Sequence, residues 1–196
     1  MKTVFVLALI IAINSTLYAQ RTDAYFGIKA GLNVASLNVE DGKDLNSIVS
    51  GHVGGLVHIH VTPKFAIQPE LFVSGQGGED DGDKLKLIYL NLPVLFQYMF
   101  GNGFRLHTGP QLGVLLSAKE KIGDAEYNVN SSFDNIDFGW DFGASYQFPG
   151  SGVGLDIRYT VGITDITESS SSDVQNRVFA FGIFYQFMNN NLGRHK

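Results

Sequence analysis

The sequence predicts an all-β protein, an eight-stranded antiparallel transmembrane barrel with up-and-down topology. Three observations lead to this fold class. Apolar and polar residues alternate in eight segments, as expected for strands whose successive side chains face opposite sides of a sheet. Tight turns alternate with long polar connections. Glycine accounts for 23 of 196 residues, and charged residues for only 17%, below the ~25% of soluble globular proteins.

The segment GVGLDIRYTVGI, residues 152–163, shows the alternation most clearly. Its odd positions, from Val153 to Ile163, are all apolar or aromatic. Its even positions hold glycine, threonine and the charged pair Asp156 and Arg158. The same pattern predicts seven further strands, within residues 25–35, 52–61, 65–73, 88–100, 104–116, 136–148 and 178–187.

The connections between these segments also alternate. Glycine- and proline-containing turns are predicted at residues 62–64, 101–103 and 149–152. Long polar loops are predicted at residues 37–50, 77–83, 118–134 and 164–176. An even number of strands with short turns at one end and long loops at the other is typical of bacterial outer-membrane barrels, and it places both ends of the barrel at the short-turn, periplasmic side.

The N-terminus indicates export. Lys2 precedes the apolar run of residues 4–13, and a small residue, Ala19, offers a cleavage point. We therefore expect a signal peptide at 1–19, an outer-membrane barrel at 20–187 and a C-terminal tail at 188–196; the alternative for the first segment is a buried strand or an anchor helix. The sequence has no cysteine, which excludes disulfides and thiolate metal sites.

Two kinds of barrel fit eight amphipathic strands. A soluble lipocalin-like barrel would turn its apolar face inward to bind a ligand, whereas a membrane barrel turns it toward lipid. The polar register is rich in glycine, which suits a narrow lumen, and the apolar register carries no charge in mid-strand. Aromatic residues on the apolar register lie near strand ends and are expected at the membrane interface: Tyr98, Phe100, Trp140, Tyr146, Phe148, Tyr185 and Phe187. We therefore predict a location in the outer membrane, with membrane lipid as a partner.

Several stretches together resemble one family. They are YFGIKAGLNVA (25–35), AIQPELFVSGQG (66–77), LIYLNLPVLFQY (87–98), GPQLGVLLSA (109–118), DFGASYQF (141–148) and GLDIRYTVGITDI (154–166). They are similar to the PorT-like outer-membrane β-barrel proteins of Bacteroidota, which are Gram-negative. The resemblance implies a small barrel that is inserted by the barrel assembly machinery, with Phe187 as a terminal signal. One namesake in that family is associated with protein secretion.

Charged side chains also occur on the predicted lumen face. They are Lys29, Glu70, Arg105, Asp137, Asp141, Asp156 and Arg158. Because both signs are present in a lumen with little free space, we expect an internal ion-pair network that plugs the barrel. A proton or ion path through the lumen is the alternative.

Other candidate sites carry weaker signals. His58 and His60 share one strand face and could bind a metal, or a loop-side histidine could serve a lipid-modifying enzyme; we expect structural histidines instead. The acidic stretch 77–83 is expected to be a solvated loop, with a calcium site as the open alternative. The net charge of −5, without a basic stripe, argues against a nucleic-acid partner. The sequence thus favours a non-enzymatic structural or accessory surface protein without a cofactor, whose loops could contact a protein partner.

Overall fold

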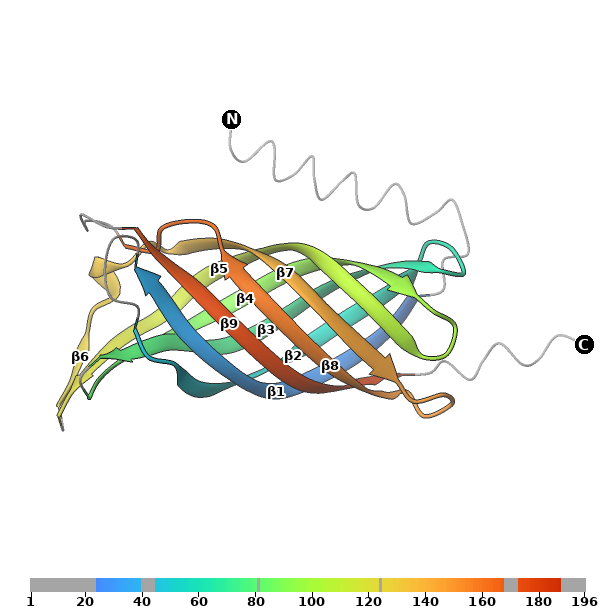
Figure 1. Ribbon diagram of the computed structural model, residues 1–196, viewed down its shortest axis with the longest axis horizontal. Coiled ribbons are helices and arrows are strands. Elements are labelled where there is room, and N and C mark those ends of the chain that lie inside the picture. Colours follow the sequence, from blue (N-terminus) through green and yellow to red (C-terminus); the bar gives the residue numbers. More distant parts are fainter. Residues whose placement is uncertain (1–23, 40–44, 81, 124, 168–172, 188–196) are drawn as a thin grey trace, which may run out of the picture.

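The strands of this protein close into a ring (Figure 1). The computed structural model describes residues 24–39, 45–80, 82–123, 125–167 and 173–187. The predicted signal peptide (1–19) and C-terminal tail (188–196) lie outside the described residues. The strands are β1 (Ala24–Val39), β2 (Ile48–His60), β3 (Phe65–Asp80), β4 (Asp83–Met99), β5 (Phe104–Ile122), β6 (Ala125–Asn128), β7 (Ile136–Gln147), β8 (Val153–Gly162) and β9 (Val174–Gln186).

Eight of these strands form the ring, and every neighbouring pair is antiparallel. The order is β1-β2-β3-β4-β5-β7-β8-β9, and the pairing of β9 with β1 closes the barrel. The predicted eight-stranded up-and-down barrel is thereby confirmed. One strand was not predicted: β6 is a four-residue strand that pairs only with the end of β5, outside the ring.

The apolar side of the sheet faces outward. Along β8, exposed and buried residues alternate without interruption: Leu155 and Ile157 are 46% and 47% exposed, whereas Asp156 and Arg158 are 6% and 3% exposed. Large apolar side chains are likewise exposed on the other seven ring strands, as at Phe26 on β1. A soluble ligand-binding barrel would require the opposite orientation, so this alternative is wrong. Among the described residues, no helix has the length and apolar character needed to span a membrane.

The two ends of the barrel differ, as the sequence predicted. Three tight turns connect β2 to β3, β4 to β5 and β7 to β8, and β1 begins and β9 ends at this same end. In the turn between β4 and β5, Gly101 and Gly103 have φ angles of 79° and 93°, a region that L side chains rarely adopt.

At the other end, two of the four predicted long loops are wrong. Residues 77–83 are mostly strand, because β3 runs to Asp80 and β4 starts at Asp83. The stretch 118–134 contains the end of β5, all of β6 and a single 3₁₀ turn, Asn130–Ser132. In these extensions the pattern inverts: apolar side chains such as Leu87 and Ala118 face inward and are buried, whereas Lys86 and Lys119 face outward. The strands therefore continue beyond the apolar outer face by which they were recognised. The ring strands β3, β4 and β5 have 16, 17 and 19 residues, against the about 9–11 that cross a bilayer.

One close approach inside the wall requires glycine. A Cβ added at Gly143 on β7 would overlap both the His107 imidazole of β5 and the backbone carbonyl of Ile157 on β8. Glycine here lets a large lumen side chain lie flat against the wall.

Candidate functional site

The lumen is the candidate site, and Glu70 on β3 lies at its centre. Its carboxylate accepts two hydrogen bonds from Arg158 on β8, at 2.9 and 3.0 Å, and one from the Lys29 ammonium on β1, at 3.0 Å. A fourth comes from the Gln68 side-chain amide, at 2.8 Å. The bidentate geometry matches a guanidinium to a carboxylate. These contacts connect strands on different sides of the barrel.

Two further carboxylates complete the network around the same cations. Asp156 lies 3.3 Å from Lys29 Nζ and 3.6 Å from Arg158 Nη2. Asp141 lies 3.5 Å from Arg158 Nη1 and accepts a 2.6 Å hydrogen bond from the Thr160 hydroxyl. The network therefore holds one ammonium group, one guanidinium group and three carboxyl groups, all buried. Such groups are stable in a low dielectric only when they are paired and hydrogen-bonded.

The other two predicted lumen charges are buried but lie apart from this network. Arg105 donates to the side-chain oxygens of Gln147 and Gln186, near the tight-turn end. Asp137 accepts from Asn176 at 2.7 Å and from Thr164 at 3.3 Å, near the loop end. All seven side chains are buried, and the sequence pattern carried no information on which of them are in contact.

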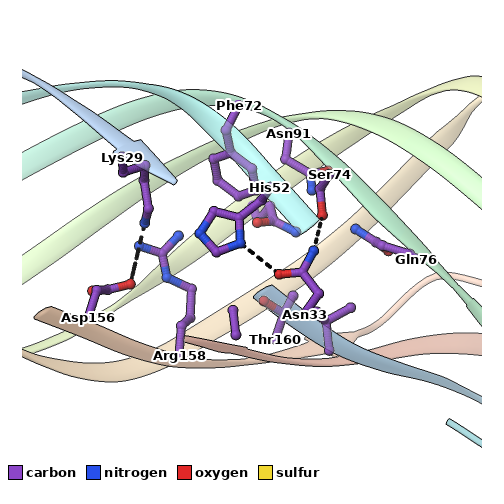
Figure 2. Close-up of a pocket in the computed structure, with 13 residues that line it drawn as sticks. Lys29, Asn33, His52, Phe72, Ser74, Gln76, Asn91, Asp156, Arg158 and Thr160 are labelled. Atoms are coloured by element: carbon purple, nitrogen blue, oxygen red, sulfur yellow. Dashed lines mark hydrogen bonds and ion pairs between the residues drawn. The ribbon is translucent and has the colours of Figure 1, made fainter. Parts of the chain in front are cut away.

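A second polar cluster lies beside the network, toward the loop end (Figure 2). The Asn33 side-chain oxygen accepts a hydrogen bond from His52 Nδ1 at 2.8 Å, and the Asn33 side-chain nitrogen donates to the Ser74 hydroxyl at 2.9 Å. A cavity of about 20 Å³, lined by both clusters, separates them. That volume is about the size needed for one water molecule. The alternation places Asn33 on the polar, lumen-facing register, but neither Asn33 nor Ser74 was predicted to be part of a lumen cluster.

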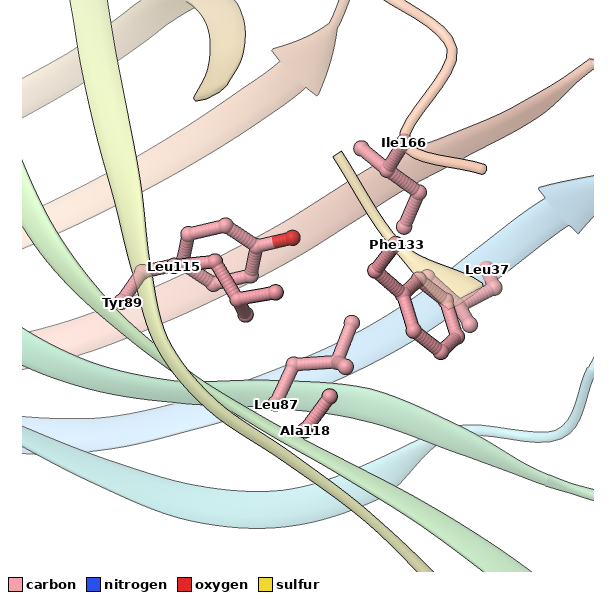
Figure 3. Packing of buried hydrophobic residues seen from close by; sticks show 7 residues of the cluster. All are labelled: Leu37, Leu87, Tyr89, Leu115, Ala118, Phe133 and Ile166. Carbon is pink, nitrogen blue, oxygen red and sulfur yellow. The ribbon is translucent and has the colours of Figure 1, made fainter. Parts of the chain in front are cut away.

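The loop end of the lumen is closed by an apolar cluster (Figure 3). It is made by inward-facing residues of three ring strands, β1, β4 and β5, and by two loop residues: Leu37, Leu87, Tyr89, Leu115, Ala118, Phe133 and Ile166. Phe133 and Ile166 come from stretches that the sequence predicted to project as loops. An isolated bridge joins Phe133 to Thr167, and Asp134 N–H donates to the Ile166 carbonyl at 2.9 Å. These two segments therefore fold into the barrel mouth.

The side chain of Asp165 holds this inward-folded segment beside the start of β9. Its carboxylate accepts from the backbone N–H groups of Val174, at 2.9 Å, and Thr167, at 3.1 Å. Partial burial opposes ionisation, but these donors outweigh it and hold the pKa of the Asp165 carboxyl below its usual value. Asp165 lies beyond the membrane-spanning strands.

The histidines are part of the wall and the lumen. His52, His58 and His107 are 6%, 0% and 4% exposed, so none lies on a loop where lipid could reach it. The His58 and His60 rings are 4.6 Å apart, edge to face, and His58 Nδ1 lies 3.1 Å from the Gln68 side-chain oxygen. Across the described segments, no group of three or more histidine or acidic side chains is arranged to hold a metal ion.

Most of the predicted interfacial aromatic residues gather at the tight-turn end. Ring centroids are 4.9 Å apart for Tyr98–Phe100, 5.3 Å for Tyr146–Phe148 and 5.4 Å for Tyr185–Phe187. Trp140 is farther along β7, and its indole N–H donates to the Thr108 hydroxyl at 2.7 Å.

Comparisons with known proteins agree with this geometry. The chain is similar in structure to Neisserial surface protein A (NspA), with a TM-score of 0.58 and 15% identity, over 84% of this chain and 99% of that one. It is also similar to Ail, the attachment invasion locus protein of Yersinia pestis, whose structure was solved in complex with the heparin analogue sucrose octasulfate. The TM-score is 0.51 and the identity 13%, over 84% of this chain and 99% of that one. At these identities the likeness shows the fold alone. No curated protein matches the sequence.

A family model described as "Outer membrane protein beta-barrel domain" matches residues 18–168, which is most of the chain. The match covers β1 to β8, including every residue of the central ion-pair network. Together with the closed ring and its apolar outer face, it shows that this chain belongs to the outer-membrane protein β-barrel domain family and lies in the outer membrane.

Proposed function

We propose that this barrel is a non-conducting, non-enzymatic anchor that presents its loop-side strand extensions at the cell surface. The observation that carries the proposal is the double closure of the lumen. The ion-pair network fills its middle, with a cavity of only about 20 Å³ beside it. The apolar cluster fills its loop end. Within the part of the chain that the structure describes, these two closures block the path of a hydrated ion.

Conductance in planar lipid bilayers tests this proposal. We expect the purified protein to show no discrete conductance steps, with a porin as positive control for insertion. The variant Phe133→Ala/Ile166→Ala removes the two loop residues of the apolar cluster and should remain closed, because the ion-pair network lies below it. Steady ohmic steps from the unmodified protein would overturn the proposal.

The non-enzymatic part of the proposal rests on where the histidines lie. A lipid-modifying enzyme needs its general base within reach of a nucleophile and of the substrate. Among the described residues, no serine or threonine hydroxyl forms a hydrogen bond with a histidine. In addition, His52, His58 and His107 face the lumen. Replacing these three with alanine should leave the lipid A and phospholipid mass spectrum of the cells unchanged; an altered profile would contradict the proposal.

The surface role is supported by the length of the loop-side strands. The β5–β6 hairpin extends beyond the ring, and Tyr127 on β6 is 54% exposed. Resemblance to the PorT-like proteins of Bacteroidota adds an association with protein secretion and insertion by the barrel assembly machinery. A photo-crosslinking residue in place of Tyr127 should capture a secretion component in cells, whereas one in place of Lys64, in a tight turn, should not. Crosslinks to lipid alone from both positions would contradict the secretion role.

A further inference from the structure

Four lysines form two directly opposed pairs on the outward face of β4 and β5. Lys84 is the cross-strand partner of Lys121, and Lys86 is the partner of Lys119. We call these four residues the lysine ladder. Like charges that face each other across a sheet destabilise it. A fold that places two such pairs in consecutive outward-facing positions therefore concentrates positive charge at one level of the barrel.

Acidic neighbours offset only part of this charge. Glu79 lies 3.1 Å from Lys84, and Glu126 lies 3.4 Å from both Lys86 and Lys119. Two carboxylates thus pair with three ammonium groups. Among the described residues, Lys121 has no ion-pair partner. The side chains of Lys84, Lys86 and Lys119 remain about half exposed, at 47%, 50% and 52%. They can donate to a further anion.

The lysine ladder lies directly above the apolar band of the barrel. A strand crosses a bilayer in about 9–11 residues, and the stretch of β4 from Tyr98 near the tight turn to Ile88 contains 11. Ile88 and Leu116 are 42% and 50% exposed and end the apolar outer face on β4 and β5. The next outward residues, one step toward the loop end, are Lys86 and Lys119. The ammonium groups are therefore at the level of lipid headgroups in the loop-side leaflet.

A groove runs beside the ladder. It has a volume of about 770 Å³ and is lined by Lys84, Lys86 and Lys121 and by the apolar side chains of Ile48, Val49 and Ile88. Glu79, the ion-pair partner of Lys84, also lines it and neutralises one of the three lysines. Gly75 and Ser50 form part of its wall, and the Ser50 side chain lies directly against Gly75. The groove thus combines cationic donors with an apolar lining that continues into the membrane-facing band.

We propose that the lysine ladder and this groove bind a membrane lipid whose phosphate-bearing headgroup has a net negative charge, in the loop-side leaflet. The ammonium groups donate hydrogen bonds to the phosphate oxygens, which also relieves the repulsion within each lysine pair. The acyl chains lie against the apolar band below. A soluble polyanion would satisfy the charges, but it would leave the apolar lining of the groove uncovered, so the lipid fits the site better.

Titration with lipids of defined headgroup tests the proposal. The full-length folded protein in phosphatidylcholine nanodiscs would be titrated with diphosphoryl lipid A and, in parallel, with the same lipid lacking its phosphates. We expect a preference for the phosphorylated lipid. The variant Lys84→Gln/Lys121→Gln should weaken that binding about 25-fold, since each lysine near an anionic surface contributes roughly fivefold. Lys64→Gln, in a tight turn at the opposite end, should bind as the unmodified protein does.

Each remaining outcome has a defined meaning. The Lys84→Arg/Lys121→Arg variant keeps the charge and should keep the preference, and heat-modifiable gel migration checks that every variant is folded. No preference for the phosphorylated lipid, or a preference that survives the glutamine variant, would overturn the proposal. Equal competition by a soluble sulfated polysaccharide in the absence of any lipid preference would assign the ladder to a soluble polyanion instead.

Discussion

Removal of the Arg158 guanidinium is the sharpest test of the lumen network. Arg158 contacts all three carboxyl groups of the network, those of Glu70, Asp156 and Asp141. The variant Arg158→Gln leaves these three groups with a single cation, Lys29, and removes two hydrogen bonds to Glu70. Breaking a buried ion pair by removing one partner costs about 3–5 kcal/mol, because the remaining charge is left uncompensated. We expect a loss in the free energy of unfolding of at least that size.

Charge counting predicts a smaller effect for Glu70→Gln. After this change Lys29 and Arg158 still face Asp156 and Asp141, so two cations meet two carboxylates. The loss is then mainly that of hydrogen bonds to a charged acceptor, about 1.5–3 kcal/mol. The predicted order of destabilisation is therefore Arg158→Gln, then Glu70→Gln.

Urea unfolding in phosphatidylcholine vesicles measures these differences, with fluorescence from Trp140, the single tryptophan of the sequence, as the signal. The matched control is Lys84→Gln, which removes a cation from an ion pair whose side chains are 47% and 31% exposed. That pair should contribute about 0–1 kcal/mol. If Arg158→Gln proves no more destabilising than Lys84→Gln, the lumen network does not stabilise the barrel and the reasoning fails.

Three further predictions test the wall and the loop end. Ile157→Lys places a charge in the middle of the lipid-facing side of β8 and should lower the free energy of unfolding in vesicles by about 2–4 kcal/mol. Ile163→Lys, just beyond the strand, should lower it by about 0–1 kcal/mol. Equal losses would contradict the orientation of the barrel. Gly143→Ala should destabilise the barrel by at least about 1–3 kcal/mol, because the new Cβ overlaps neighbouring atoms. Gly55→Ala should be tolerated in the same assay, because its Cβ would lie 3.6 Å from the nearest atom. Because the pKa of Asp165 is lowered in the folded state, its stabilising contribution is present above the unfolded pKa of about 3.9 and is lost as the pH falls through the folded value. NMR amide shifts of its two backbone donors should therefore titrate below about pH 4 and lose this titration in Asp165→Asn; a midpoint at or above the usual carboxyl value would contradict the assignment.

The sequence alone determined the ring of eight strands and the orientation of their faces. A strand has a side-chain period of two, so each residue is assigned to one face as soon as the strand is recognised. The outward position of Ile157 and the inward position of Arg158 follow from this period, and the structure agrees with both. Glycine on the inner register and the absence of mid-strand charges on the outer one then distinguish a membrane barrel from a soluble one.

Only the tertiary structure decided which residues meet inside the barrel. Glu70 and Arg158 are 88 positions apart in the chain, and their contact depends on the stagger between strands. A shift of pairing by two residues keeps every side chain on its face but changes its neighbours across the lumen, so alternation cannot encode it. This is why Arg105 has the predicted burial but lies outside the central network.

The loop end was the least predictable part for a related reason. Past the apolar band the outer face becomes polar, as at Lys86 and Lys119, and the inner face becomes apolar, as at Leu87 and Ala118. The lipid-facing pattern that identified the strands no longer applies there, and the extensions of β3, β4 and β5 were missed. The inward folding of Phe133 and Ile166 was also missed, since single apolar residues in a polar stretch have no periodicity. Local alternation therefore specified the wall of this barrel, whereas long-range packing specified what fills and closes it.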